Sequence, residues 1–144
     1  MSDNATYQFV DTNVLVYAHD RSAGRKYTRA QHLLQELWES EAGCLSTQVL
    51  QAFYVTVTRK VAKPLPAEQA SRIIDDLGAW RIHRPTVQDI RQAIAIQTRY
   101  IVSFWDAMII RSAACLGCVT LWSEDLNARQ LYERVRVANP FDVS

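Results

Sequence analysis

The sequence predicts an α/β fold, a three-layer α/β/α sandwich in which helices cover both faces of a mostly parallel sheet. Two observations support this prediction. Short apolar segments typical of buried strands alternate with longer segments whose apolar residues recur every three or four positions, as in amphipathic helices. The 144 residues also contain no internal repeat, linker or low-complexity segment, so we expect one domain over residues 1–144.

The first half of the chain opens with a strand expected at residues 7–10, which ends at Asp11. A helix follows over residues 24–39, and the expected buried residues of this helix are Leu33, Leu34, Leu37 and Trp38. A short strand is expected at residues 44–46. It leads directly into a segment at 47–61 whose pattern is ambiguous.

The ambiguity at residues 47–61 comes from two overlapping patterns. Residues 53–58 include β-branched side chains in two-residue alternation, which favours a strand. Val49, Phe53, Val57 and Val61 are spaced four residues apart, which favours one face of a helix. We expect a helix, because the four-residue spacing continues across the whole segment.

The second half of the chain continues the alternation. Pro suits a first helical turn, Ser and Thr suit helix N-caps, and Gly suits a helix C-terminus. On these signals the expected elements are helices at 66–77, from 85–86 onward and at 103–117, strands at 80–83 and 118–122, a short helix at 126–134 and a candidate last strand at 135–137.

Composition narrows the classes of function. The net charge of +1 is no general signature of polyanion binding, so any nucleic-acid surface must come from local clusters. No apolar stretch is long enough to span a membrane, and the first residues lack the pattern of a signal peptide, so we expect a cytoplasmic protein. The odd total of three cysteines argues against a disulfide framework. Cys115 and Cys118 have CxxC spacing, but they end a predicted helix, where its dipole does not acidify a thiol, so we expect buried structural thiols.

Three aspartates stand where parallel sheets commonly bind ligands. Asp11 ends the first strand, Asp125 follows the strand at 118–122, and Asp106 lies near the start of an almost wholly apolar helix. Each one alone is better explained as a helix cap, and Ser103 with Asp106 has capping-box spacing. Crowded together, the carboxylates repel one another, and a divalent ion with oxygen ligands removes this conflict. The residues therefore predict a Mg²⁺ or Mn²⁺ site that polarises a phosphate and delivers hydroxide.

Four short segments around these acids, DTN at 11–13, STQVLQ-FY, FWDAMIIRSA and SEDLN, stand in an order and spacing that resembles the PIN-domain nucleases. The likeness is greatest to the ribonuclease toxins of the VapC type in bacterial toxin–antitoxin pairs, and it covers about residues 7–137. It implies a PIN-like fold, Mg²⁺- or Mn²⁺-dependent cleavage of RNA, a homodimer and a small inhibitory antitoxin protein. The catalytic positions it implies are Asp11, Ala52, Asp106 and Asp125, of which the three aspartates bind the metal, with Asn13 as a supporting polar residue.

Position 52 departs from the pattern of this family, in which the corresponding helix carries a glutamate after S-T-x-V-x-x. Here residues 46–51 keep the pattern and Ala52 follows. The chain is therefore expected to be weak or inactive, either through a deliberate substitution that silences a toxic nuclease, which we favour, or through natural divergence. Glu124 is a conceivable substitute, although its neighbour Asp125 is expected to point the other way, as adjacent residues do at a strand end.

Basic and aromatic residues give modest support for RNA binding. Two groups of cations are candidates for phosphate contacts, although a solvated helix face explains them equally well: Arg21, Arg25, Lys26 and Arg29, and then Arg59, Lys60 and Lys63. Trp105 and Trp122 flank the acids, and we expect them to pack in the core rather than to stack on bases.

Two rival functions stay open. The loss of the glutamate at position 52 is also expected of a non-catalytic PIN-like module that binds RNA or a protein partner. A phosphatase with an aspartyl nucleophile places an aspartate at a strand end as well, but that chemistry usually needs a second acid two residues on, where this chain has Asn13. Nuclease activity with added metal separates the first rival from an enzyme.

Overall fold

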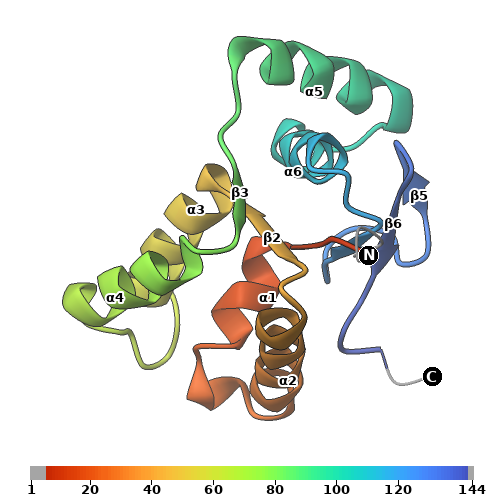
Figure 1. The fold of residues 1–144 in the computed structure, drawn as a ribbon. Coiled ribbons are helices and arrows are strands. Elements are labelled where there is room, and N and C mark those ends of the chain that lie inside the picture. The colour runs from red at the N-terminus through yellow and green to blue at the C-terminus, as the bar shows by residue number, and fades with distance from the viewer. Residues whose placement is uncertain (1–5, 143–144) are drawn as a thin grey trace.

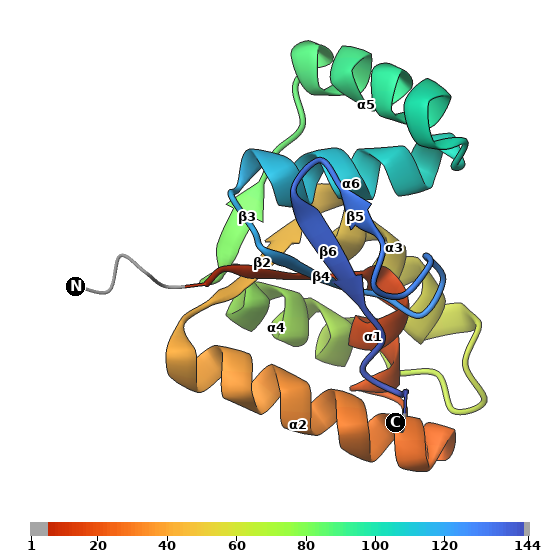
Figure 2. The ribbon, with the colours of Figure 1, turned by 90° about the vertical axis from the view of Figure 1, so that its right-hand side faces the viewer.

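A computed structural model describes residues 6–142 and shows a central sheet with helices on both faces (Figures 1 and 2). The strand order is β3-β2-β1-β4-β6-β5, and every neighbouring pair is parallel except β5 and β6. The strands are β1 (Gln8–Val10), β2 (Gly43–Ser46), β3 (Arg81–His83), β4 (Thr120–Trp122), β5 (Leu131–Tyr132) and β6 (Val135–Ala138). The expected α/β/α sandwich with a mostly parallel sheet is thus confirmed.

The helices form two unequal layers. Their bounds are α1 (Thr12–Tyr17), α2 (Arg25–Ser40), α3 (Thr47–Arg59), α4 (Ala67–Leu77), α5 (Val87–Tyr100) and α6 (Phe104–Cys115), with a 3-10 turn, η2, at Arg21–Ala23. On one face α6 packs against the sheet and α5 lies over α6, while α1 to α4 pack together on the other face (Figure 2). In the described part of the chain no one helix has the length and apolarity to cross a bilayer. Only α5 and α6 taken together do, as a pair bent by 114°.

Side-chain caps set the starts of the helices that carry the site. Ser46 Oγ accepts a hydrogen bond from Val49 N–H at 3.2 Å, which begins α3 directly after β2. Ser103 Oγ accepts one from Asp106 N–H at 3.0 Å, which begins α6. Within α3 the side chains of Val49, Phe53 and Val57 are fully buried, so the four-residue spacing prevails over β-branched propensity, as expected.

The prediction of a short helix at residues 126–134 is wrong. Residues 131–138 form the antiparallel hairpin of β5 and β6, so the expected last strand is present but pairs with its immediate predecessor. Glu133 and Arg134 turn the chain with φ values of 47° and 72°. Two consecutive residues with positive φ make the tight turn whose twist suits a hairpin, and they cannot continue a right-handed helix.

The prediction that Trp38 is buried with the leucines of α2 is also wrong, because its side chain is 42% exposed. Its ring meets the ring of Trp80 edge to face, with centroids 5.4 Å apart. The three leucines Leu33, Leu34 and Leu37 are buried as expected. Trp38 therefore lies at the margin of the apolar stripe of α2.

A buried polar cluster joins β3, α5 and α6. Asp89 Oδ1 accepts a hydrogen bond from Arg111 Nε at 2.9 Å, and Asp89 Oδ2 lies 3.1 Å from His83 Nε2. His83 Nδ1 lies 2.7 Å from Ser112 Oγ, and the backbone N–H of Thr86 donates to Asp89 Oδ2 at 2.8 Å. Burial by itself raises the pKa of Asp89, but these bonds and the charge of His83 lower it to about 2.

We expect Asp89→Asn to destabilise the fold by about 3 kcal/mol at pH 7, because it removes one charge from a buried pair and leaves Arg111 without its partner. The pKa of Asp89 lies below the ordinary value of 3.8, so its stabilisation is complete above pH 4 and is lost as the pH falls through about 2. Urea unfolding at pH 7 and near pH 2 measures this. The free energies of unfolding of the original protein and of Asp89→Asn should differ at pH 7 and become nearly equal near pH 2. The control is Asp76→Asn, at an exposed position of α4. A loss at pH 7 no larger than that of the control would contradict the role of Asp89.

Candidate functional site

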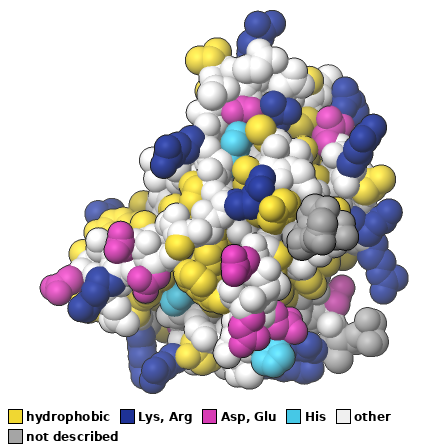
Figure 3. Space-filling model, viewed as in Figure 1, with side chains coloured by type: hydrophobic (Ala, Val, Ile, Leu, Met, Phe, Trp, Pro, Cys, Tyr) yellow, Lys and Arg dark blue, Asp and Glu magenta, His cyan; other side chains and the backbone are white. Residues whose placement is uncertain are grey.

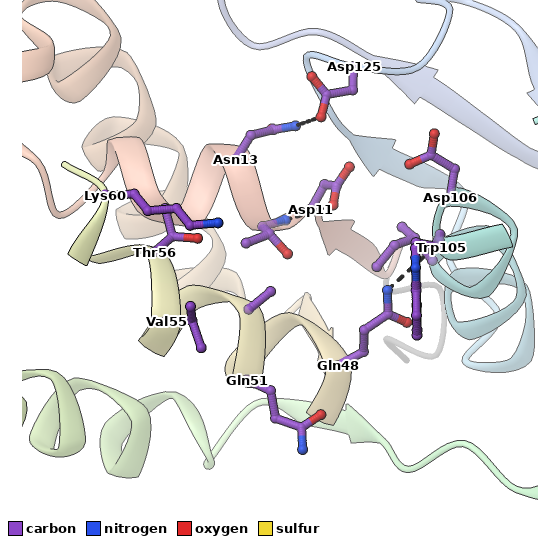
Figure 4. A pocket seen from close by; sticks show the side chains of 13 residues that line it. Asp11, Asn13, Gln48, Gln51, Val55, Thr56, Lys60, Trp105, Asp106 and Asp125 are labelled. Carbon is purple, nitrogen blue, oxygen red and sulfur yellow. Dashed lines mark hydrogen bonds between the residues drawn. The ribbon is translucent and has the colours of Figure 1, made fainter. Parts of the chain in front are cut away.

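A pocket of about 810 Å³ opens between the end of β1, helices α1, α3 and α6, and the loop after β4. It brings together the five positions predicted to be catalytic or to support catalysis: Asp11, Asn13, Ala52, Asp106 and Asp125 (Figure 4). The reason is topological. β1 and β4 are parallel neighbours, so Asp11 and the residues after β4 leave the sheet at the same carboxyl-terminal edge.

Asp11 is the most buried of the three acids, with 6% of its surface exposed. It caps α1, and its Oδ1 accepts a hydrogen bond from Thr12 N–H at 2.7 Å. Its Oδ2 accepts one from Ser123 Oγ at 2.8 Å. Burial raises the pKa of Asp11 to about 6, although the bonds from Ser123 and Thr12 oppose the shift, and the charges of Asp106 and Asp125 add to it. A nearby cation would stabilise the charged form of this carboxylate.

Ser123 is a functional candidate that the reading of the sequence missed. Besides holding Asp11, its Oγ accepts a hydrogen bond from Asp125 N–H at 3.2 Å, so one hydroxyl links two of the acids. The SEDLN segment contained a sequence signal that could have identified Ser123. Ser123 is the short polar residue at the end of a buried strand, and it is fully buried.

Asp106 and Asp125 face Asp11 from two other elements. Asp106 lies in the first turn of α6. Burial raises its pKa, Ser103 opposes the shift, and the charge of Asp125 adds to it. Asp125 is exposed, and its Oδ2 accepts a hydrogen bond from Asn13 Nδ2 at 2.9 Å. Asn13 Oδ1 in turn accepts one from Glu124 N–H at 3.3 Å, so Asn13 ties α1 to the loop after β4.

The donors in this pocket suit a hard divalent ion. Carboxylate and amide oxygens are the ligands that Mg²⁺ and Mn²⁺ prefer, and Mg²⁺ commonly keeps several waters and only one or two carboxylates. Asp11, Asp106 and Asp125 do not all offer oxygens within 4.8 Å of one another. They therefore fit an ion that contacts some of them directly and others through water.

A tighter group of metal-ligand types lies elsewhere in the described residues, at His83, Asp89 and Cys115, with atoms within 4.8 Å. It is a poor cation site, because Asp89 already accepts bonds from Arg111 and Thr86. Cys115 is exposed at the end of α6, so the expectation of a buried thiol is wrong for Cys115 and confirmed for Cys118.

Glu124 does not replace the missing acid. Its carboxylate forms an ion pair with Lys26 and accepts a hydrogen bond from Tyr17 Oη at 2.9 Å. Both partners lie outside the residues that line the pocket, as does Glu124 itself. Lys26 is thus engaged in fixing the loop after β4. Its predicted companions are exposed positions that do not line the pocket: Arg21, Arg25 and Arg29.

Helix α3 lines the pocket with one stripe that includes Gln48, Ala52 and Thr56. The stripe continues to Lys60, just past the end of α3. No acidic side chain stands on this wall among the residues that line the pocket. Ala52 therefore leaves the acids of β1, α6 and the β4 loop without a carboxylate facing them from α3.

The two tryptophans beside the acids differ. Trp122 is partly buried, and its Nε1 donates to Gln8 Oε1 at 2.7 Å, a structural contact. Trp105 lines the pocket and is 66% exposed, so the expectation that it packs in the core is wrong. The pattern of α6 could not show this, because apolar residues occupy nearly all of its faces.

The family model of the PIN domain matches residues 9–134. The VapC20 toxin of Mycobacterium tuberculosis, described as cleaving the sarcin-ricin loop, is similar in structure, with a TM-score of 0.62, 18% identity, and 82% of this chain and 89% of that chain covered. A toxin–antitoxin complex from Klebsiella pneumoniae is also similar, with a TM-score of 0.65 and 20% identity. The match covers 94% of this chain and 99% of that chain.

VapBC2 of Rickettsia felis, solved on a DNA fragment from the promoter of the pair, gives a TM-score of 0.65 and 19% identity, with 92% and 98% of the two chains covered. At these identities the structural likeness establishes the fold. No curated protein sequence matches the chain. Because the family model spans most of the chain, this protein belongs to the PIN domain family.

Proposed function

We propose that this protein is a metal-dependent endoribonuclease of the VapC toxin type, which hydrolyses RNA phosphodiesters. The observation that carries the proposal is the pocket in which Asp11, Asp106 and Asp125 converge at the carboxyl-terminal edge of a PIN-family sheet. The named toxin structures that share this fold support it.

The residues of the pocket have separate tasks in this proposal. Asp11, Asp106 and Asp125 would hold Mg²⁺ or Mn²⁺, and a bound ion of this kind polarises a phosphate and lowers the pKa of a coordinated water. Ser123 fixes the carboxylate of Asp11, and Asn13 fixes that of Asp125, so neither needs to be reoriented when substrate arrives. Asp106, half-buried at the start of α6, closes the third side.

Ala52 reduces this activity in the chain as it stands. A carboxylate at this position would add a negative charge and two acceptor oxygens to the wall of α3, where Gln48 and Thr56 now flank a methyl group. Without it the three aspartates would hold an ion more weakly and would orient its water less well.

A small antitoxin protein and a second copy of the chain complete the proposal. An arginine of the antitoxin fits the pocket, because its planar guanidinium pairs bidentately with carboxylates such as Asp11 and Asp106. The pair would act in the cytoplasm, where RNA is accessible. Co-purification with the product of a neighbouring small gene tests the antitoxin, and light scattering at micromolar concentration tests the homodimer.

A non-catalytic RNA-binding module is the second candidate. Ala52 favours it, because the wall of α3 offers no carboxylate to the pocket. The two candidates predict different results with the same RNA panel.

The test is cleavage of several structured RNAs by the purified protein, with Mn²⁺ or Mg²⁺ and with EDTA. We expect slow cleavage that needs the ion and disappears in Asp106→Asn but not in the Asp76→Asn control. A generic phosphate monoester should not be hydrolysed. Absence of cleavage by both this chain and its Ala52→Glu variant would leave the binding module as the function.

A further inference from the structure

We infer that the pocket takes an unpaired nucleotide of RNA, with its base stacked on Trp105 and a backbone phosphate at Lys60. The inference rests on the proposed RNA substrate and goes beyond it by naming the RNA element that is recognised. It also assigns binding roles to two residues that carry none of the metal chemistry.

Trp105 has the properties of a stacking platform. Its side chain is 66% exposed at the pocket, immediately before Asp106. An indole exposed to this extent gains apolar burial when a base covers it. Its position is set before any ligand binds. The ring of Phe104 packs against it edge to face, with centroids 5.1 Å apart, and its carbonyl accepts a hydrogen bond from Gln48 Nε2 at 3.3 Å.

Gln48 adds a polar group to the same wall. Its Oε1 is buried and has no hydrogen-bond partner in the described structure, while its Nε2 is bound to the carbonyl of Trp105 (Figure 4). The bond from Nε2 ties the start of α6 to α3. Gln48 therefore helps to hold the backbone of Trp105 in place before a ligand binds.

Lys60 lies across the pocket from Trp105, and its side chain extends toward the middle of the pocket (Figure 4). It stands on the stripe of α3 that carries Ala52 and Thr56, and it is the only basic residue among those that line the pocket. An ammonium here attracts a phosphate that the three carboxylates would repel. Because position 52 is alanine, no carboxylate on that stripe pairs with Lys60.

The charges on the face drawn in Figure 3 and the low net charge favour local recognition over binding along a duplex. Figure 3 shows Lys and Arg side chains scattered around the edges of one face and interspersed with acids. The net charge is +1, which gives little general attraction for a polyanion. In a duplex the faces of the bases are covered by their neighbours, so a ring such as that of Trp105 reaches bases only in single strands, loops and bulges.

The experiment measures binding of fluorescein-labelled RNA by anisotropy, with Ca²⁺ in place of Mn²⁺ and RNA integrity checked on a gel. The probes are a single strand, a hairpin with an unpaired loop and a blunt duplex. We expect the first two to bind more tightly than the duplex. Trp105→Ala should weaken their binding by about 5–150-fold, since stacking contributes about 1–3 kcal/mol per base, and Trp105→Phe should retain most of it.

Two matched controls separate these roles from general effects. Trp38→Ala removes another exposed indole, one that packs on Trp80 away from the pocket, and should leave binding unchanged. Lys60→Ala should reduce the slope of log affinity against log salt by about 0.7, the value for one phosphate on a single strand. Arg91→Ala, at an exposed position of α5 outside the pocket lining, should not.

Equal binding of duplex and single strand, or equal effects of Trp105→Ala and Trp38→Ala, would overturn the inference. If Ala52→Glu still cleaved RNA, the nuclease proposal would survive that result. Conversely, loss of binding in Trp105→Ala together with an inactive Ala52→Glu would support the nucleotide site and reject the nuclease.

Discussion

Replacing Ala52 with glutamate is expected to raise metal-dependent RNA cleavage by about 10–100-fold or more, the usual effect of restoring a group beside a metal site. Position 52 lines the pocket from α3, on the stripe that also carries Gln48 and Thr56. A carboxylate there faces the pocket that holds Asp11 and adds a ligand for the ion or an acceptor for its water. Both alanine and glutamate favour helices, so α3 should keep its structure.

The measurement compares RNA cleavage by the two proteins with Mn²⁺, with Mg²⁺ and with EDTA. Ala52→Gln is the matched control, because it has nearly the same size and shape as the glutamate variant but no charge. It should stay as weak as the original chain. Equal activity of the alanine and glutamate forms would show that position 52 lies outside the reacting site.

Asp11→Asn is expected to abolish Mn²⁺ binding and at the same time to stabilise the metal-free fold. The pKa of Asp11 is raised by burial from 3.8 to about 6, so the folded state disfavours the charged carboxylate. Between these two pH values the folded protein holds the proton more tightly than the unfolded chain, and stability falls as the pH rises. At pH 7 the charge of Asp11 costs about 3 kcal/mol, from the size of this shift.

Asparagine removes that charge and keeps the shape of the side chain, so its amide oxygen still accepts from Thr12 N–H. We expect the free energy of unfolding to rise by about 1–3 kcal/mol at pH 7. This gain shrinks toward pH 4, because the carboxyl group of Asp11 is then protonated in the folded protein. Chemical unfolding at the two pH values measures the gain, and calorimetry measures Mn²⁺ binding. Asp76→Asn, at an exposed site, should change neither. Unaltered Mn²⁺ affinity in Asp11→Asn would show that the metal site is wrongly assigned.

The effects expected of Ala52→Glu and Asp11→Asn have the same physical cause. Three acids converge on one pocket and Asp11 is buried there, an arrangement that destabilises the metal-free protein. Sites of this kind persist because the function needs the charge, and their stability is supplied by the rest of the fold. The fully buried side chains of α3 and the cluster around Asp89 are parts of that support.

Local pattern was sufficient for most of the elements. The spacing of Val49, Phe53 and Val57 predicted the helix α3, and Ser103 marked where α6 begins. Caps and periodicity act within a few residues, so they can be read from a single sequence. The order of the acid-bearing segments likewise identified the family and the positions that line the pocket.

Tertiary structure alone decided the rest. The hydroxyl of Ser123 reaches Asp11 across 112 residues of sequence because β1 and β4 are parallel neighbours, a pairing that no local pattern encodes. The turn at Glu133 and Arg134 carries neither Gly nor Asn, so its two positive φ values had no signature, and a helix was expected in its place. Trp105 and its buried neighbour Ile110 lie on the same apolar helix. Only the elements packed around that helix determine which of the two side chains is covered and which faces water.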